Sequence, residues 1–153
     1  MSTRGLRTVL SIALVVITGL SGGLVSVSSA SAATGPKVVV SPSVNLRNGE
    51  VVHVTGSGFK AGDTVYFVEC LAKAKGQSGC LVNGIPPYAT ITATGLLRRT
   101  SFKVVTGKVG SGRGAGTCGT TKTNLKNCAV SVGNAAGGDS AVGLITFKAP
   151  AKK

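Results

Sequence analysis

The sequence has no tryptophan, a single histidine and few aromatic or acidic residues. Aromatic side chains make up 4% of its 153 residues, and its four carboxylates are widely separated. Glycoside hydrolysis needs two carboxylates placed across one bond, whereas the acids here occupy expected turns and one strand. These acids are Glu50, Asp63, Glu69 and Asp139. Their scarcity argues against a carboxylate-based enzyme.

The remaining side chains also disfavour a nucleophilic enzyme. His53 is the only base available to a serine or cysteine, and it alternates with Val52 and Val54. That alternation predicts an exposed or half-buried strand residue instead of a catalytic group. Zinc sites use ligands that are a few residues apart, whereas each pair of cysteines here has nine residues between its members. The chain also has only one imidazole to offer. We expect neither catalytic activity nor a bound metal ion.

The beginning of the chain has the three parts of a secretory signal. Arg4 and Arg7 precede an apolar run over residues 9–27, which small residues follow. Glycine and serine interrupt the run, so a retained membrane anchor is the less favoured alternative. No later apolar stretch is long enough to span a bilayer, and we expect a secreted, extracellular protein. The expected parts are a signal peptide over residues 1–33, one domain over 34–148 and a basic tail over 149–153.

The mature chain is strongly basic. The whole chain carries a formal net charge of +13, and loss of Arg4 and Arg7 with the signal lowers it to +11. This charge favours anionic partners such as nucleic acid, wall polyanions or membrane surfaces, although a solvated surface without a partner is the alternative. For DNA we expect weak, non-specific and salt-sensitive contact with phosphates, because no helix or ribbon carries side chains matched to base edges.

Short apolar runs alternate with turn residues throughout the mature chain, and no stretch shows helical spacing. This pattern predicts an all-β fold, and seven short strands match a sandwich. The glycine-rich segment 107–119 is expected to form a mobile ribbon or loop. The expected strands are residues 37–41, 51–56, 64–70, 89–94, 100–106, 128–132 and 141–147.

One of these strands is expected to be covered on part of both faces. In residues 64–70, Val65 and Phe67 face one way while Tyr66 and Val68 face the other. Successive side chains of a strand point to opposite sides of a sheet. Because both sets are apolar or aromatic, neither face of this strand is expected to be fully exposed.

The four cysteines form two sets, each with nine residues between its members. An exported chain with an even count is normally oxidised, and three connectivities are possible. We favour two local bridges, Cys70 with Cys80 and Cys118 with Cys128, because a hairpin can hold such close residues at bonding distance. Each bridge is expected to stabilise the fold by roughly 2 to 4 kcal/mol.

Two segments of the mature chain have a distinctive order of strands, turns and cysteines. The first runs from Val51 to Cys70 and contains the turn Gly-Phe-Lys-Ala-Gly-Asp between two strands. The second begins at Cys128 and continues through Asn134-Ala135-Ala136-Gly137 to the last expected strand. Together these segments resemble the neocarzinostatin family of exported apoproteins. The resemblance, over residues 38–147, implies an immunoglobulin-like seven-stranded β-sandwich with two local disulfides. It also implies a non-enzymatic carrier of a non-covalently bound enediyne-type chromophore, associated with DNA damage and antibacterial defence.

The chain departs from the chromophore carriers where the resemblance places the ligand cleft. Instead of stacking aromatic side chains it has Ala72, the stretch 85–88 and a glycine-rich ribbon over 108–116. Aromatic pairs contribute roughly 0.5 to 1.5 kcal/mol each, so we expect weak binding of a small hydrophobic ligand. The cleft is expected between the disulfide loops and the ribbon, formed by Leu71, Ala72, Leu81, Ile85, Tyr88, Val109, Ala129, Ser131 and Gly133.

A basic immunoglobulin-like module of the cell envelope is the alternative function. Such an adhesion module would bind polyanions through a face of positive charge. The residues expected to form this face are Arg98, Arg99, Lys103, Lys108 and Arg113. With either function we expect a monomer.

Overall fold

The computed structural model describes residues 35–150, whose regular structure is β-strand apart from two short turns. The expected signal peptide and the last three residues of the expected tail lie outside these residues. Two short 3₁₀ turns, η1 (Gln77–Gly79) and η2 (Gly112–Gly114), interrupt the strands. The strands are β1 (Lys37–Ser41), β2 (Val51–Ser57), β3 (Thr64–Leu71), β4 (Cys80–Leu81), β5 (Tyr88–Thr90), β6 (Leu97–Lys103), β7 (Gly107–Val109), β8 (Gly116–Cys118), β9 (Cys128–Gly133) and β10 (Ser140–Ile145).

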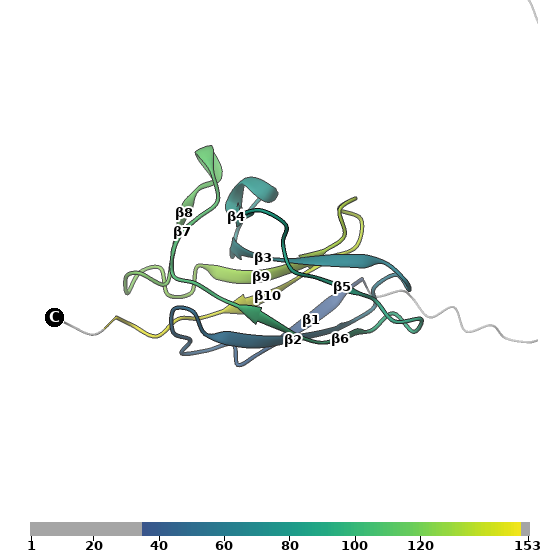
Figure 1. Cartoon of the computed structure of the whole chain (residues 1–153). Coiled ribbons are helices and arrows are strands. Elements are labelled where there is room, and N and C mark those ends of the chain that lie inside the picture. Colours follow the sequence, from purple (N-terminus) through teal and green to yellow (C-terminus); the bar gives the residue numbers. More distant parts are fainter. Residues whose placement is uncertain (1–34, 151–153) are drawn as a thin grey trace, which may run out of the picture. The chain divides into compact units, whose positions relative to one another are not determined.

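Two antiparallel sheets pack face to face (Figure 1). One has the strand order β1-β2-β6, and the other has the order β10-β9-β3 with β4 and β5 on the free edge of β3. β5 pairs with the first half of β3 and β4 with its second half, so together they occupy the place of one edge strand. Three strands therefore face four, and the expected all-β, seven-stranded sandwich is confirmed.

Alternating apolar side chains build the core between the sheets. Val52 and Val54 of β2 are fully buried, and they face Val65 and Phe67 of β3 across the sandwich. Burying one such side chain stabilises the fold by roughly 1.5 to 3 kcal/mol. The other face of β3 is partly covered, because Tyr66 and Val68 are half-buried. The expectation that neither face of this strand is fully exposed is therefore confirmed.

Two strands are shifted from their expected positions. β5 ends at Thr90, and β6 runs over 97–103, so the expected strands 89–94 and 100–106 are wrong at their boundaries. The partners of β2 explain the shift in β6, because Val54 faces Thr100 whereas Gly56 faces Leu97. One extra residue on β6 forms a β-bulge. The strand therefore begins before the two arginines, which the sequence alone assigned to a loop.

The glycine-rich segment forms a ribbon, one of the two expected forms, and its mobility stays a prediction. β7 and β8 form an antiparallel hairpin that projects from the sandwich beside β4 (Figure 1). The backbone alone supplies the hydrogen bonds of a ladder, so a segment almost without apolar side chains still pairs.

Both expected disulfides are confirmed, because Cys70 is bonded to Cys80 and Cys118 to Cys128.

Candidate ligand pocket

A pocket of about 550 Å³ lies on the outer face of the larger sheet. Its floor comes from side chains that point away from the core, because strand residues alternate between the two faces. The floor residues are Tyr66 and Val68 of β3, Ser131 and Gly133 of β9, and Val142 of β10. An apolar hollow with a few polar groups is the usual form of a small-molecule site.

Two loops form the walls of this pocket. Both loops lie on the same side of the larger sheet (Figure 1). One wall is the segment from Leu71 to Cys80, which the first disulfide ties to β3. The other is the turn between β9 and β10, which contributes Asn134, Ala135 and Gly137. The pocket is therefore bounded by one disulfide loop and one hairpin turn.

Hydrogen bonds to a distant turn hold the β9–β10 wall in place. Oδ2 of Asp139, which is 9% exposed, accepts a 2.9 Å hydrogen bond from the backbone N–H of Lys60. Nδ2 of Asn134 donates a second bond of 2.9 Å to Oδ2 of Asp63. Both partners belong to the turn between β2 and β3. This pair of bonds, which we call the hairpin clamp, fixes the wall against the body of the sandwich.

The ribbon packs against the disulfide loop by its backbone. The N–H of Ser111 donates a 2.8 Å hydrogen bond to the carbonyl oxygen of Ser78 in η1. A Cβ atom at Gly114 would collide with Oγ of Ser78. Glycine is needed here for close approach, so the composition of the ribbon reflects its docking on η1.

The structure brings some of the expected cleft residues together and separates the others. Four of them, Leu71, Ala72, Ser131 and Gly133, line the pocket. The other five do not line it. Val109 and Ala129 are fully buried in the protein, and Leu81 lies over a neighbouring hollow. Ile85 and Tyr88 are instead 87% and 63% exposed to solvent, outside the pocket. The ribbon contributes no wall either. Contact of any of the nine residues with a ligand stays a prediction.

Tyr66, Val68 and Val142 line the pocket although they are absent from the expected cleft set. Tyr66 is the one aromatic residue in the lining, and its ring lies 6.2 Å from that of Tyr88 between centroids. The alternation in residues 64–70 already placed Tyr66 and Val68 on the face away from the core. That periodicity is the signal that identifies both residues.

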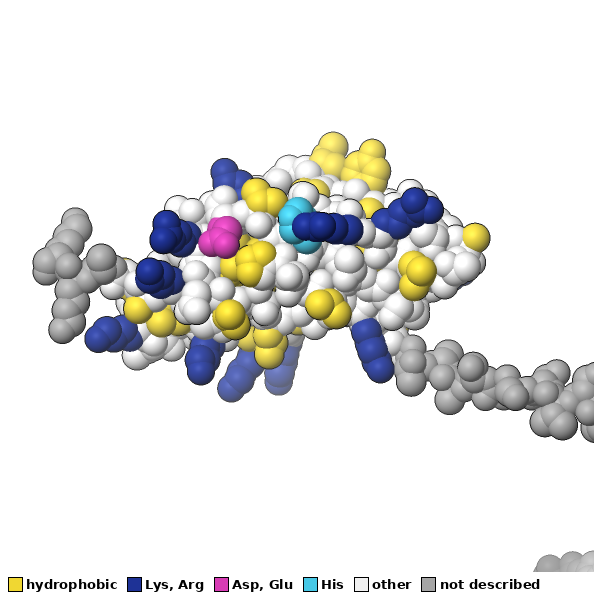
Figure 2. All heavy atoms as spheres, turned by 90° about the horizontal axis from the view of Figure 1, so that it is seen from below, with side chains coloured by type: hydrophobic (Ala, Val, Ile, Leu, Met, Phe, Trp, Pro, Cys, Tyr) yellow, Lys and Arg dark blue, Asp and Glu magenta, His cyan; other side chains and the backbone are white. Residues whose placement is uncertain are grey.

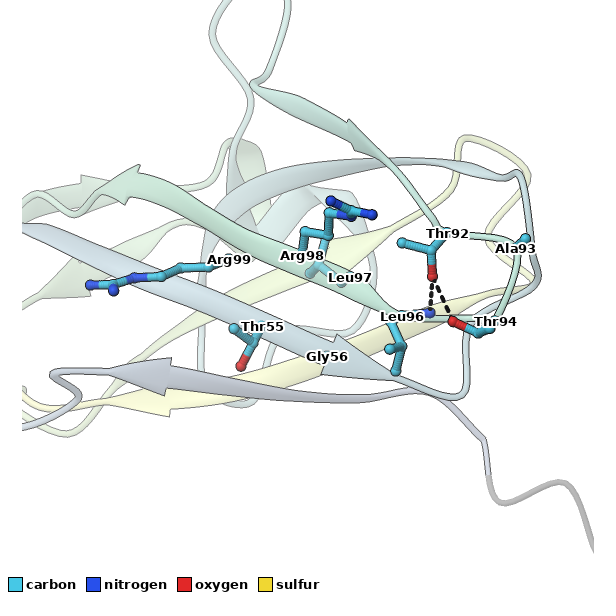
Figure 3. Close-up of a pocket in the computed structure, with 9 residues that line it drawn as sticks. All are labelled: Thr55, Gly56, Thr92, Ala93, Thr94, Leu96, Leu97, Arg98 and Arg99. Carbon is cyan, nitrogen blue, oxygen red and sulfur yellow. Dashed lines mark hydrogen bonds between the residues drawn. The ribbon is translucent and has the colours of Figure 1, made fainter.

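A second hollow, of about 750 Å³, lies at the end of the smaller sheet (Figure 3). Thr55, Leu96 and the two arginines of the β6 bulge are part of its lining, and Oγ1 of Thr92 accepts a 3.0 Å bond from the N–H of Leu96. Figure 3 shows Arg98 and Arg99 leaving β6 in different directions. Because the two guanidinium groups do not converge and no aromatic side chain lines this hollow, we favour the first pocket as the ligand site.

The expected basic residues do not form one face. Arg99 and Lys103 are exposed on β6, with Arg98 in the bulge. Lys108 lies in β7 and Arg113 in η2, and Figure 1 shows this hairpin on the side of the molecule away from β2 and β6. Positive charge is thus distributed over both sides of the sandwich.

Glu69 is a buried carboxyl group in the core. It is 2% exposed, and burial raises its pKa from the usual 4.5 to about 7, although a hydrogen bond from the N–H of Val105 opposes the rise. One carboxylate oxygen lies within 4.8 Å of the sulfur atoms of Cys118 and Cys128, which are bonded to each other. Glu69 does not line the pocket, so we assign it no role in ligand binding.

Comparison with known proteins shows the family. The sequence pattern of the Neocarzinostatin family matches residues 38–147. The chain belongs to the neocarzinostatin family. It is 32% identical over 129 residues to the antitumor antibiotic C-1027 apoprotein of Streptomyces globisporus, and the alignment covers 84% of this chain and 85% of that protein. Actinoxanthin of Streptomyces globisporus has the same identity and coverage.

The structural comparison agrees. The solved structure of macromomycin superposes with a TM-score of 0.57 at 26% identity, covering 74% of this chain and 99% of that one. Neocarzinostatin-family apoproteins are secreted, non-enzymatic carriers that bind enediyne chromophores without a covalent bond. The expectation that the chain is not an enzyme is confirmed by this membership. Within residues 35–150, no helix is long and apolar enough to cross a bilayer.

Proposed function

We propose that this protein is a secreted carrier that holds a small hydrophobic molecule of the enediyne chromophore type in the pocket on its larger sheet. The observation that carries the proposal is the apolar floor of that pocket, enclosed by the disulfide loop and the β9–β10 turn. Family membership supports the class of ligand. Antibacterial activity directed at DNA would then belong to the carried molecule, because the pocket holds no catalytic constellation.

The pocket offers a weak grip on a flat aromatic ring. Tyr66 is its one aromatic residue, and Ala72 stands on the wall where a larger ring would add stacking area. Each missing aromatic pair removes roughly 0.5 to 1.5 kcal/mol, so two or three of them correspond to about one to three decades in Kd. We therefore expect micromolar affinity for a planar aromatic ligand. Nanomolar affinity would contradict this part of the proposal.

A fluorescence titration with a naphthalene derivative tests the site. Ser131→Trp fills the floor of the pocket and is expected to weaken binding at least tenfold. Val44→Trp adds the same ring at an exposed loop residue outside the pocket and should leave binding unchanged. Equal effects of the two variants, or no binding by the unaltered protein, would overturn the proposal. Mass spectrometry of protein isolated from its native culture then identifies the molecule carried there.

A further inference from the structure

The outer face of sheet β1-β2-β6 carries basic and hydroxyl side chains. Its cations are Lys37 of β1 and Arg99 and Lys103 of β6, all exposed. Figure 2 shows this side of the molecule, with lysine and arginine side chains, the single histidine and an acidic side chain. We call the outward residues of these three strands the basic sheet face.

A row of hydrogen-bonding side chains crosses the middle of this face. The strand register places Ser41 opposite His53 and His53 opposite Ser101. Oγ of Ser101 lies 3.4 Å from Nδ1 of His53. Along β6, Arg99, Ser101 and Lys103 follow one another at every second residue, which spaces their Cα atoms by roughly 7 Å. A cation, a hydroxyl and a second cation therefore lie in line along one strand.

None of the three strands of this face contains a carboxylate. Glu50 precedes β2, and its Oε2 accepts a 2.7 Å hydrogen bond from the N–H of Arg47. Asp63 and Asp139 serve the hairpin clamp, and Glu69 is buried in the core. The basic sheet face is thus complementary to a negatively charged partner, and its hydroxyl groups donate to the acceptor oxygens that such a partner offers.

We propose that the basic sheet face binds a flexible, base-free phosphodiester chain, namely a polyol phosphate of the kind that makes cell walls anionic. A glycerol phosphate repeat contains six backbone bonds, as two amino-acid residues do, so its phosphates can follow the roughly 7 Å spacing along β6. Each phosphate would meet Arg99, Ser101 or Lys103 in turn. Lys37 and His53 lie beside this line on the neighbouring strands.

The chemistry of the face disfavours the other anionic partners. It has no outward phenylalanine, tyrosine or tryptophan on which unpaired bases would stack. Val39 and Val51 are its only apolar side chains, too few and too short to enter a lipid bilayer. Duplex DNA is a stiff rod with a persistence length of about 50 nm, and a rod meets a small sheet along only a short line.

Calorimetric titration of the exported protein with a synthetic glycerol phosphate oligomer tests the proposal. With three phosphates engaged, affinity should fall about twentyfold between about 50 and about 200 mM salt. The triple variant Lys37→Gln, Arg99→Gln, Lys103→Gln should weaken binding at least tenfold and flatten the salt dependence. Its melting temperature, measured in parallel, shows that the sandwich still folds.

A matched control separates the face from the total charge. Lys75→Gln, Lys122→Gln, Lys126→Gln removes the same charge from exposed positions outside the three strands and should change affinity less than threefold. Equal weakening by both triple variants would overturn the proposal. It is also overturned if duplex DNA or anionic lipid vesicles bind more tightly at equal phosphate concentration and lose that binding in the face variant. None of these results bears on the ligand pocket.

Discussion

The backbone N–H of Val105 donates a 2.8 Å hydrogen bond to Oε2 of Glu69 and so joins the chain after β6 to the core of the opposite sheet. The carboxyl group is buried, and among the described residues its other oxygen has no hydrogen-bond partner. A buried polar atom without a partner costs free energy, and an ionised one costs more. Burial therefore makes the sandwich more stable when Glu69 is protonated, although the hydrogen bond from Val105 by itself favours the carboxylate.

Glu69 should make stability depend on pH between about 4.5 and about 7. The raised pKa means that the folded state holds the proton more tightly, so its stabilising contribution is complete below 4.5 and is lost as the pH rises to about 7. Glu69→Gln keeps an acceptor for Val105 without the charge. At pH 8 we expect this variant to be more stable by about 3 kcal/mol, with little difference at pH 4.

Urea unfolding at both pH values measures this difference directly. If Glu69→Gln and the unaltered protein show parallel pH dependence, ionisation of Glu69 is not its source. If the unaltered protein instead loses stability on acidification through pH 4.5, the carboxylate is stabilised in the folded state and the sign of the argument is reversed.

The two disulfides should contribute to different properties. Cys118 and Cys128 are fully buried in the core, whereas Cys80 is only half-buried in the pocket wall. Replacing both buried cysteines by alanine should cost about 2 to 4 kcal/mol of unfolding free energy. Replacing Cys70 and Cys80 should cost less stability but reduce binding of the naphthalene probe, because the wall from Leu71 onward loses its tie. Equal losses of both properties in the two double variants would contradict this division.

The sequence predicts the sandwich well because its signals are local. The alternation of Val65, Tyr66, Phe67 and Val68 determines which side chains enter the core and which reach the outer face. The arrangement of the pocket depends on contacts between distant segments, which no local pattern encodes. Val109 is the clearest example, since its place in the ribbon indicated a cleft residue, whereas the fold buries it completely in the core.

The β6 bulge and the ribbon show the same limit. Arg98 and Arg99 have the composition of a loop, and only the register against β2 shows that the strand passes through them. The glycines of the ribbon indicate mobility when taken alone. Their true requirement, close approach to Ser78, becomes evident only once η1 and η2 lie together.

The docking of the ribbon on η1 gives a direct test of that requirement. Gly114→Ala places a Cβ atom 2.7 Å from the carbonyl carbon of Ser78 and should push the ribbon outward. We expect faster hydrogen exchange at the N–H of Ser111 and a loss of about 1 kcal/mol in stability. Gly138→Ala is the matched control, because no atom lies within 4 Å of its added Cβ. Unchanged exchange at Ser111 in the first variant would show that the ribbon is held by other contacts.

The hairpin clamp should control ligand affinity through the shape of the pocket. Asp139→Ala removes the acceptor for the N–H of Lys60 and frees the turn that carries Asn134 and Ala135. Loss of this part-buried bond should cost about 1 to 2 kcal/mol of stability. Affinity for the naphthalene probe should fall severalfold more than in Glu50→Ala, which removes a carboxylate from an exposed turn away from the pocket.

Asp63→Ala should also lower affinity, because it breaks the second bond of the hairpin clamp. Since both bonds restrain one turn, the double variant should lose less affinity than the two single losses together predict. Strictly additive losses would show that Asp63 and Asp139 act on the pocket independently.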